Sequence, residues 1–89
     1  MVYSSVMYYV YILKSLRDSM LYTGSTKDLR KRFKDHNHGK VYSTKYRTPF
    51  ELLYYEAYKS EKDARHREKN LKLRSNAFRQ LKKRINNCL

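Results

Sequence analysis

At 89 residues the chain has room for a single domain with a thin core, and its two glycines and one proline argue against disordered or low-complexity sequence. No apolar run approaches the roughly 20 residues of a membrane span. The N-terminus lacks a signal-peptide pattern, and the lone Cys88 excludes an internal disulfide, so we expect a cytoplasmic protein with no membrane partner. The 21 lysines and arginines against eight acids leave a net charge of +13, which predicts a polyanionic partner, nucleic acid before anionic lipid.

The first half of the chain predicts a hairpin followed by a helix. Residues 8–14 are dense in aromatic and β-branched side chains and predict a strand, and residues 20–24 predict a second, antiparallel strand after a polar loop of about five residues. Ser25-Thr26 then offers an N-cap for a helix over residues 27–37, with Asp28 in its first turn and Gly39 at its end.

The second half predicts one more strand and two helices. A basic, tyrosine-bearing loop (40–49) precedes a third strand over residues 51–59, after which Ser60 caps a helix over residues 61–73. Ser75 or Asn76 begins a third helix, whose apolar stripe is Phe78, Leu81 and Ile85. The order ββαβαα predicts one α/β (α+β) domain over residues 1–89, with its core at about 8–81 and a small three-stranded antiparallel sheet flanked by helices.

Two polar residues lie on or beside the apolar face of the first predicted helix. At about 100° per residue, Phe33, His36 and Arg32 all fall within about 60° of Leu29. A snorkelling arginine and a hydrogen-bonded core histidine would explain this placement. The alternative is a cleft that stabilises negative charge.

Glu68 is an acid on the buried side of the otherwise basic second helix. A buried carboxylate is costly unless it is paired or bound to a metal. An ion pair with Arg32 is one explanation. As a hard oxygen ligand for Mg²⁺ or Mn²⁺, Glu68 fits equally well.

The tyrosines of the strands need no functional explanation, because tyrosine favours strands. Tyr22-Thr23-Gly24 differs, since a glycine ending a strand indicates close approach of backbone or ligand.

These residues together resemble the GIY-YIG nuclease superfamily. Tyr9-Val10-Tyr11 and Tyr22-Thr23-Gly24 are similar to its paired GIY and YIG tripeptides, and Arg32, His36 and Glu68 follow in the family's order on the predicted elements. The similarity covers roughly residues 8–81 and is greatest to a short stand-alone branch, which is related to the amino-terminal nuclease domain of the excinuclease.

The resemblance implies the GIY-YIG endonuclease fold and a role for each matched position. Tyr11 and Tyr22 match the phenols that position or deprotonate the attacking water, and Gly24 matches a glycine that permits close packing. Arg32 matches the arginine on the scissile phosphate, His36 a position that contacts phosphate or aids proton transfer, and Glu68 the carboxylate that holds one divalent ion, Mg²⁺ or Mn²⁺.

The sequence departs from the family pattern at three places. Tyr9 stands where the first tripeptide has glycine, and Ser25 follows Gly24 where the excinuclease branch has lysine. Some members carry an asparagine about twelve residues after the glutamate, where this chain has Gln80, so the resemblance implies no phosphate anchor on the third helix.

We therefore expect a metal-dependent endonuclease that acts on DNA, with a function in repair or recombination and a protein partner for targeting as further expectations. The loop after the first helix could grip phosphates and stack on a splayed base through Lys40, Tyr42, Lys45, Tyr46 and Arg47, although an ordinary solvated loop would look the same. A non-catalytic nucleic-acid-binding module of the same fold is the alternative, and a structural RNA-associated protein is a weaker third.

Overall fold

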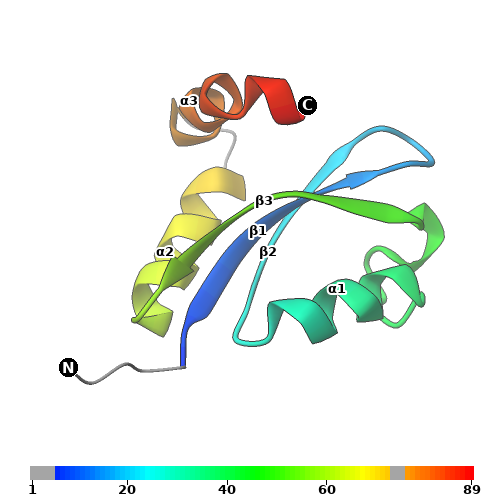
Figure 1. Ribbon diagram of the computed structural model, residues 1–89, viewed down its shortest axis with the longest axis horizontal. Helices are drawn as coiled ribbons and strands as arrows, with labels where there is room; N and C mark the ends of the chain where they lie inside the picture. The colour runs from blue at the N-terminus through cyan, green and yellow to red at the C-terminus, as the bar shows by residue number, and fades with distance from the viewer. Residues whose placement is uncertain (1–5, 73–75) are drawn as a thin grey trace.

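The computed structural model describes residues 6–72 and 76–89, which form three strands and three α-helices (Figure 1). In chain order these are β1 (Tyr8–Ser15), β2 (Leu21–Thr26), α1 (Leu29–Asn37), β3 (Phe50–Tyr58), α2 (Glu61–Lys72) and α3 (Asn76–Arg84). Two short 3-10 helices, η1 (Lys45–Arg47) and η2 (Asn86–Cys88), lie in the loop before β3 and after α3. The predicted order ββαβαα and the α+β class are confirmed.

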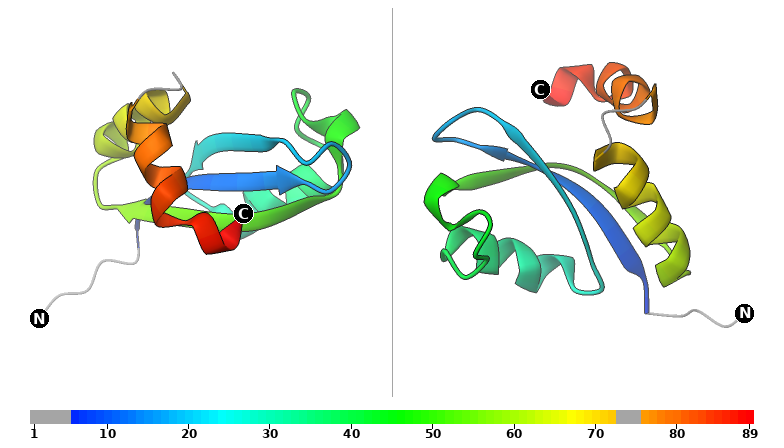
Figure 2. Two further views of the ribbon diagram at one scale, coloured as in Figure 1. Left: turned by 90° about the horizontal axis from the view of Figure 1, so that it is seen from above. Right: turned by 180° about the vertical axis from the view of Figure 1, so that it is seen from behind.

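The three strands form one antiparallel sheet in the order β2-β1-β3, so β1 is the central strand. Helix α1 lies against one face of the sheet, while α2 and α3 lie against the other (Figures 1 and 2). Between Ile12 and Leu13 the register against β3 shifts by one residue, which leaves Leu53 as a bulge.

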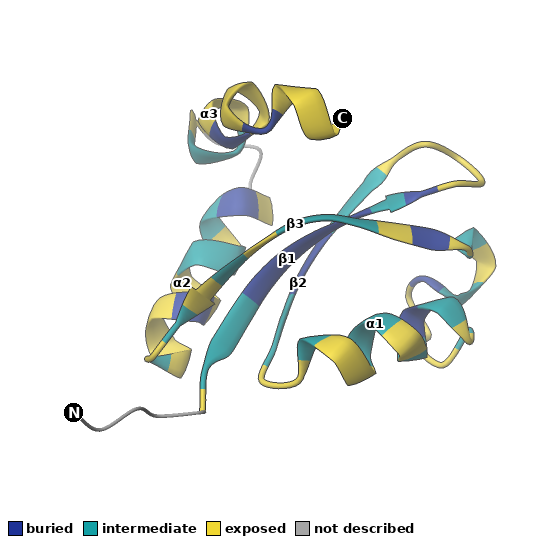
Figure 3. Cartoon of the chain, viewed as in Figure 1, coloured by how far each residue is buried: buried dark blue, intermediate teal, exposed yellow. Residues whose placement is uncertain are grey.

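Alternation along β1 sends its side chains into two small cores. Val10 and Ile12 pack with Leu71 and Leu81 beneath α2 and α3, and the intervening side chains pack on the face of α1. Burial is therefore concentrated on the central strand, while the outer faces of the helices are exposed (Figure 3). A thin core of this kind agrees with the short chain.

The boundaries of the first helix differ from the prediction. Ser25 and Thr26 do not cap it but continue β2, paired with Val10 and Tyr9 of β1. Asp28 is the N-cap, because its Oδ1 accepts a hydrogen bond from the Lys31 backbone N–H at 3.1 Å. The helix thus begins at Leu29 rather than residue 27. The predicted start at Ser75 and the end at residue 73 lie outside the described residues.

Side-chain hydrogen bonds join α1 to the start of β3. The Asn37 amide accepts from the Phe50 N–H at 2.6 Å and donates to the Phe50 carbonyl at 3.2 Å. Among the described residues, none of the helices has the length and apolar character needed to cross a membrane.

Candidate active site

A buried chain of hydrogen bonds connects β1, α1 and the loop that follows α1. Tyr11 Oη and His36 Nε2 lie 2.9 Å apart, and His36 Nδ1 lies 2.8 Å from Thr44 Oγ1. All three side chains are almost completely buried. The sequence predicts that α1 turns His36 toward the sheet, and the burial of His36 confirms this. Arg32 lies on the same side of the helix, because it is four residues away.

Tyr22 and Gly24 come to the same point from β2, the edge strand next to β1. The Tyr22 ring lies 5.1 Å from the His36 ring and 6.4 Å from that of Tyr11. Gly24 pairs with Tyr11 across the sheet, and a Cβ at this position would lie only 2.6 Å from Tyr11 Cζ. The close approach expected at Gly24 is therefore present: the phenol ring of Tyr11 lies directly against the glycine backbone.

Burial controls the protonation of this pair. It raises the pKa of Tyr11 to about 12, although the hydrogen-bonding guanidinium of Arg32 opposes the rise. It lowers the pKa of His36 to about 4, with the positive charge of Arg32 as a further cause. At neutral pH Tyr11 is therefore a phenol and His36 is a neutral imidazole, which can accept a hydrogen bond, while burial and the charge of Arg32 oppose its protonation.

Arg32 is half-buried one helical turn before His36. Its Nε is buried and has no hydrogen-bond partner in the described part of the chain. A buried guanidinium N–H without an acceptor is unfavourable, and phosphate oxygens are the acceptors that the planar fork fits best.

Glu68 reaches the site from α2, on the opposite face of the sheet. Its Oε1 accepts a hydrogen bond from Ser25 Oγ at 2.6 Å, and its Oε2 lies 2.7 Å from Lys72 Nζ, one turn further along α2. An ion pair with Arg32 is one of the two explanations offered by the sequence, but the described ion pair of Glu68 is with Lys72. Lys72 Nζ also lies 6.0 Å from the centroid of the Tyr22 ring, so the Glu68–Lys72 pair lies beside the cluster around Tyr11.

The residues around Glu68 fit a divalent ion with a single protein carboxylate. No cluster of three or more histidine, cysteine, aspartate or glutamate side chains able to hold a metal occurs among the described residues. Mg²⁺ commonly keeps several waters and binds one or two carboxylates together with substrate phosphate. Glu68 already attracts a cation, the Lys72 ammonium, and a serine hydroxyl lies beside it.

Two exposed tyrosines flank a lysine in the loop after α1. Tyr42 and Tyr46 are 84% and 75% exposed, and Lys45 Nζ lies 4.7 Å and 4.9 Å from the centroids of their rings. Lys40 is also exposed. Arg47 is placed differently, because its Nε donates to Asp18 Oδ2 at 2.8 Å and its Nη2 to the Met20 carbonyl. Its guanidinium therefore joins this loop to the β1–β2 turn.

Tyr9 lies apart from the cluster around Tyr11. Its ring contacts Tyr55 edge to face, with centroids 5.9 Å apart. Sequence reasoning missed two residues that do contact the site. Lys72 could have been found from its spacing of four residues after Glu68 on one helix. Thr44 carries no such signal, because only the fold of the loop brings it to His36.

Comparisons with known proteins identify the family. Residues 7–86 match the model of the GIY-YIG catalytic domain. The chain is 43% identical over 74 residues to UPF0213 proteins of Streptococcus pyogenes serotypes M3 and M1, covering 82% of this chain and 79% of each relative. A solution structure of a UPF0213 protein from Bacillus halodurans, 36% identical, superposes with a TM-score of 0.51 and covers 84% of this chain and 80% of that one. The chain therefore belongs to the GIY-YIG catalytic domain family and is similar to short stand-alone UPF0213 proteins.

Proposed function

We propose that this protein is a divalent-metal-dependent endonuclease that hydrolyses phosphodiester bonds in DNA. The observation that carries the proposal is the buried Nε–H of Arg32, which has no hydrogen-bond partner among residues 6–72 and 76–89 and lies beside the Tyr11–His36 hydrogen bond. An anion-binding group and a proton-accepting pair at one point are what phosphodiester hydrolysis needs.

Arg32 holds the scissile phosphate in this proposal. Its guanidinium donates to the non-bridging oxygens and stabilises the charge that develops on them in the transition state. Phosphate binding supplies the acceptor that its Nε lacks within the described part of the chain. The same negative charge offsets the repulsion between Arg32 and a protonated His36, so the imidazole becomes a better proton acceptor when substrate is bound.

Tyr11 and His36 handle the proton of the attacking water. The Thr44 hydroxyl donates to the Val41 carbonyl, with Oγ1 3.5 Å from that oxygen. Its lone pairs are then available to accept a hydrogen bond from a proton on His36 Nδ1. His36 Nε2 is then the acceptor for the Tyr11 phenol, whose oxygen accepts in turn from water. Tyr22 contacts His36 and is less buried than Tyr11, so its phenol is the alternative base.

Glu68 would hold the metal, with its carboxylate oriented by Ser25. The metal would replace the Lys72 ammonium at the Glu68 oxygen that the ammonium contacts. A bound Mg²⁺ or Mn²⁺ would neutralise charge on the phosphate and on the leaving oxygen. We propose that Lys40, Tyr42, Lys45 and Tyr46 contact the DNA backbone beside the cleavage site. Arg47 acts there by holding the loop against the turn at Asp18.

A cleavage assay with matched variants tests this function. We expect purified protein with Mg²⁺ or Mn²⁺ to nick plasmid or branched DNA, and Arg32→Ala or Glu68→Gln to reduce the rate at least about 100-fold. Arg65→Ala and Glu61→Gln make the same chemical changes in a solvent-exposed ion pair on α2, so they should cleave normally. Cleavage that survives both site changes would contradict the assignment.

A non-catalytic nucleic-acid-binding module of the same fold is the second candidate, favoured by the exposed Tyr42–Lys45–Tyr46 group. It predicts salt-sensitive binding, no turnover with any divalent ion, and no effect of Glu68→Gln. A function in repair or recombination, a protein partner for targeting and a cytoplasmic location are proposals that accompany the endonuclease.

A further inference from the structure

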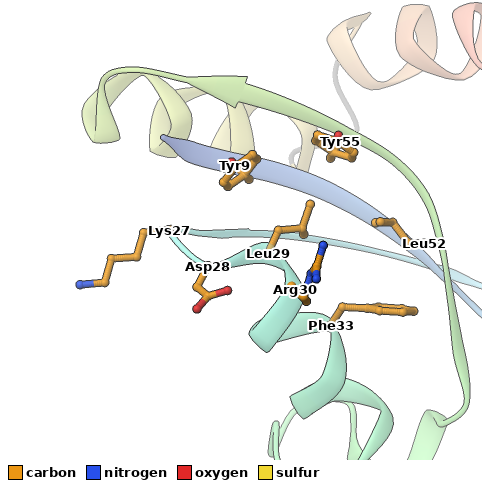
Figure 4. Close-up of a pocket in the computed structure, with 8 residues that line it drawn as sticks. All are labelled: Tyr9, Lys27, Asp28, Leu29, Arg30, Phe33, Leu52 and Tyr55. Atoms are coloured by element: carbon orange, nitrogen blue, oxygen red, sulfur yellow. The ribbon is translucent and has the colours of Figure 1, made fainter. Parts of the chain in front are cut away.

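A pocket of about 430 Å³ lies between the N-terminal end of α1 and the sheet (Figure 4). Tyr9 of β1 and Leu52 and Tyr55 of β3 form its sheet side, and Leu29 and Phe33 of α1 face them. The pocket is open because α1 begins only at Leu29, which leaves this end of the sheet face uncovered. Tyr55 is consequently 52% exposed although it lies within a strand.

This pocket adjoins the candidate active site. Tyr9 and Tyr11 are two residues apart on β1, so they point to the same face about 7 Å from each other. Leu29 and Phe33 pack against the cluster that contains Tyr11, and Phe33 follows Arg32 directly. A nucleotide bound at Arg32 therefore has its neighbour within reach of the pocket.

The mouth of the pocket is positively charged. Lys27 and Arg30 line it and are exposed. Asp28 is also there, but its Oδ1 already accepts from the Lys31 N–H as the helix cap. Apolar and aromatic walls with cations at the opening suit a flat ring that is attached to a phosphate.

The pocket also accounts for the first departure from the family pattern. Tyr9 stands where the GIY tripeptide has glycine. Its ring meets Tyr55 at 67° and forms one wall. A glycine at this position would leave the wall open.

We propose that this pocket binds an unpaired nucleobase of the DNA strand, stacked on Tyr55 and Tyr9, with the adjoining phosphate at Lys27 and Arg30. The inference rests on the endonuclease function proposed above and specifies its substrate class: DNA with an unpaired nucleotide next to the scissile phosphate. A base inside a duplex would first have to leave its stack, at a cost that an already unpaired base does not carry.

Equilibrium binding without metal tests the pocket separately from catalysis. Fluorescence anisotropy in EDTA would compare three DNAs of one sequence: a paired duplex, the duplex with one bulged 2-aminopurine, and the same bulge without a base. We expect the bulged base to raise affinity roughly 5- to 150-fold over the abasic bulge, as expected for one stacked base, and to quench 2-aminopurine fluorescence.

Variants at the two walls supply the matched controls. Tyr9→Thr/Tyr55→Thr should bring the ratio of base to abasic affinity close to one, because threonine keeps the strand propensity but removes both rings. Tyr55→Phe should keep the ratio, because phenylalanine retains the ring on which the base stacks. Circular dichroism checks that each variant is folded.

Each outcome decides the proposal. Equal affinity of the wild-type protein for the bulged base and the abasic bulge would overturn it, even if the double variant does not fold. Cleavage of DNA without any base preference would leave the endonuclease standing and reject the pocket. Base preference without cleavage would support the pocket and reject the endonuclease. A dimer that Tyr55→Thr dissociates, together with no base preference, would show that the pocket instead binds a second copy of the chain.

Discussion

At the residue scale, the candidate site depends on one glycine and one buried histidine. Gly24 leaves room on β2 for the Tyr11 phenol, and His36 holds that phenol through a hydrogen bond of 2.9 Å. Both residues shape the site through their contacts with Tyr11, whether or not they contact substrate. Each can be tested by a measurement that separates its physical cause from a general loss of structure.

Replacing Gly24 with alanine should destabilise the protein by about 1–3 kcal/mol, because the new Cβ overlaps a buried ring that cannot move without breaking its bond to His36. Thermal unfolding measures this change. Gly39→Asn is the control, since asparagine tolerates the φ of +70° there and a Cβ would meet Lys45 Cβ at an ordinary contact distance of 3.9 Å. A Gly24→Ala protein as stable as the wild type would contradict the packing described.

The lowered pKa of His36 makes stability depend on pH. The imidazole titrates near 6.5 when unfolded and near 4 when folded, so the unfolded state binds the extra proton between these values. Its contribution is complete above about pH 6.5 and is lost as pH falls toward 4. In chemical unfolding across this window, the wild type should lose roughly 1–3 kcal/mol more than His36→Gln, which cannot titrate. Parallel curves for the two proteins would show that burial does not control this group.

At the scale of elements, two polar contacts fix the helices that carry the site. Asn37 joins α1 to the backbone of Phe50 at the start of β3. Arg67 of α2 donates two hydrogen bonds of 2.9 Å to Glu56 of β3. Burial by itself would raise the pKa of Glu56, but the bonds from Arg67 and two tyrosines lower it to about 2, so this carboxylate stays charged at neutral pH. Arg32 and Glu68 thus come from helices fixed to the same strand from opposite faces.

Removal of the Asn37 side chain tests the first contact. Asn37→Ala leaves the N–H and carbonyl of Phe50 without these partners, and should cost about 1–3 kcal/mol. Because α1 carries Arg32 and His36, the cleavage rate should also fall while the variant remains folded. Asn86→Ala, an exposed asparagine in η2, is the control and should change neither quantity. If both variants behave alike, the contact does not position α1.

At the scale of the whole molecule, the charge of +13 favours binding to a polyanion over any neutral partner. The loop with Tyr42, Lys45 and Tyr46 and the helix α2 lie at opposite ends of the sheet (Figure 1). Variants of a lysine at each end therefore distinguish a local contact with DNA from attraction by the net positive charge of the whole molecule.

Salt dependence of DNA binding makes this distinction. If Lys45 contacts a phosphate, Lys45→Gln should reduce the slope of log K against log salt by about one and lower affinity. Lys62→Gln removes the same charge from an exposed position on α2 and should change the slope much less. Equal slopes for both variants would indicate that only the total charge matters.

Local patterns in the sequence are enough to establish the order of the elements and the candidate site positions Arg32, His36 and Glu68. Side-chain periodicity and helix spacing are local properties, and they control which face of an element is buried. The predicted start of α1 lies two residues too early, because serine and threonine at positions 25 and 26 suit a helix cap as well as the end of a strand. Pairing with β1 places them in the strand, and a local pattern does not show that pairing.

The partners of these residues follow from tertiary packing instead. Thr44 reaches His36 through a loop, and Ser25 of β2 donates a hydrogen bond to Glu68 of α2, 43 residues later in the chain. The pocket beside Tyr9 likewise exists because α1 leaves one end of the sheet uncovered. Such contacts join residues far apart in the chain, and they depend on how the elements pack rather than on any local pattern.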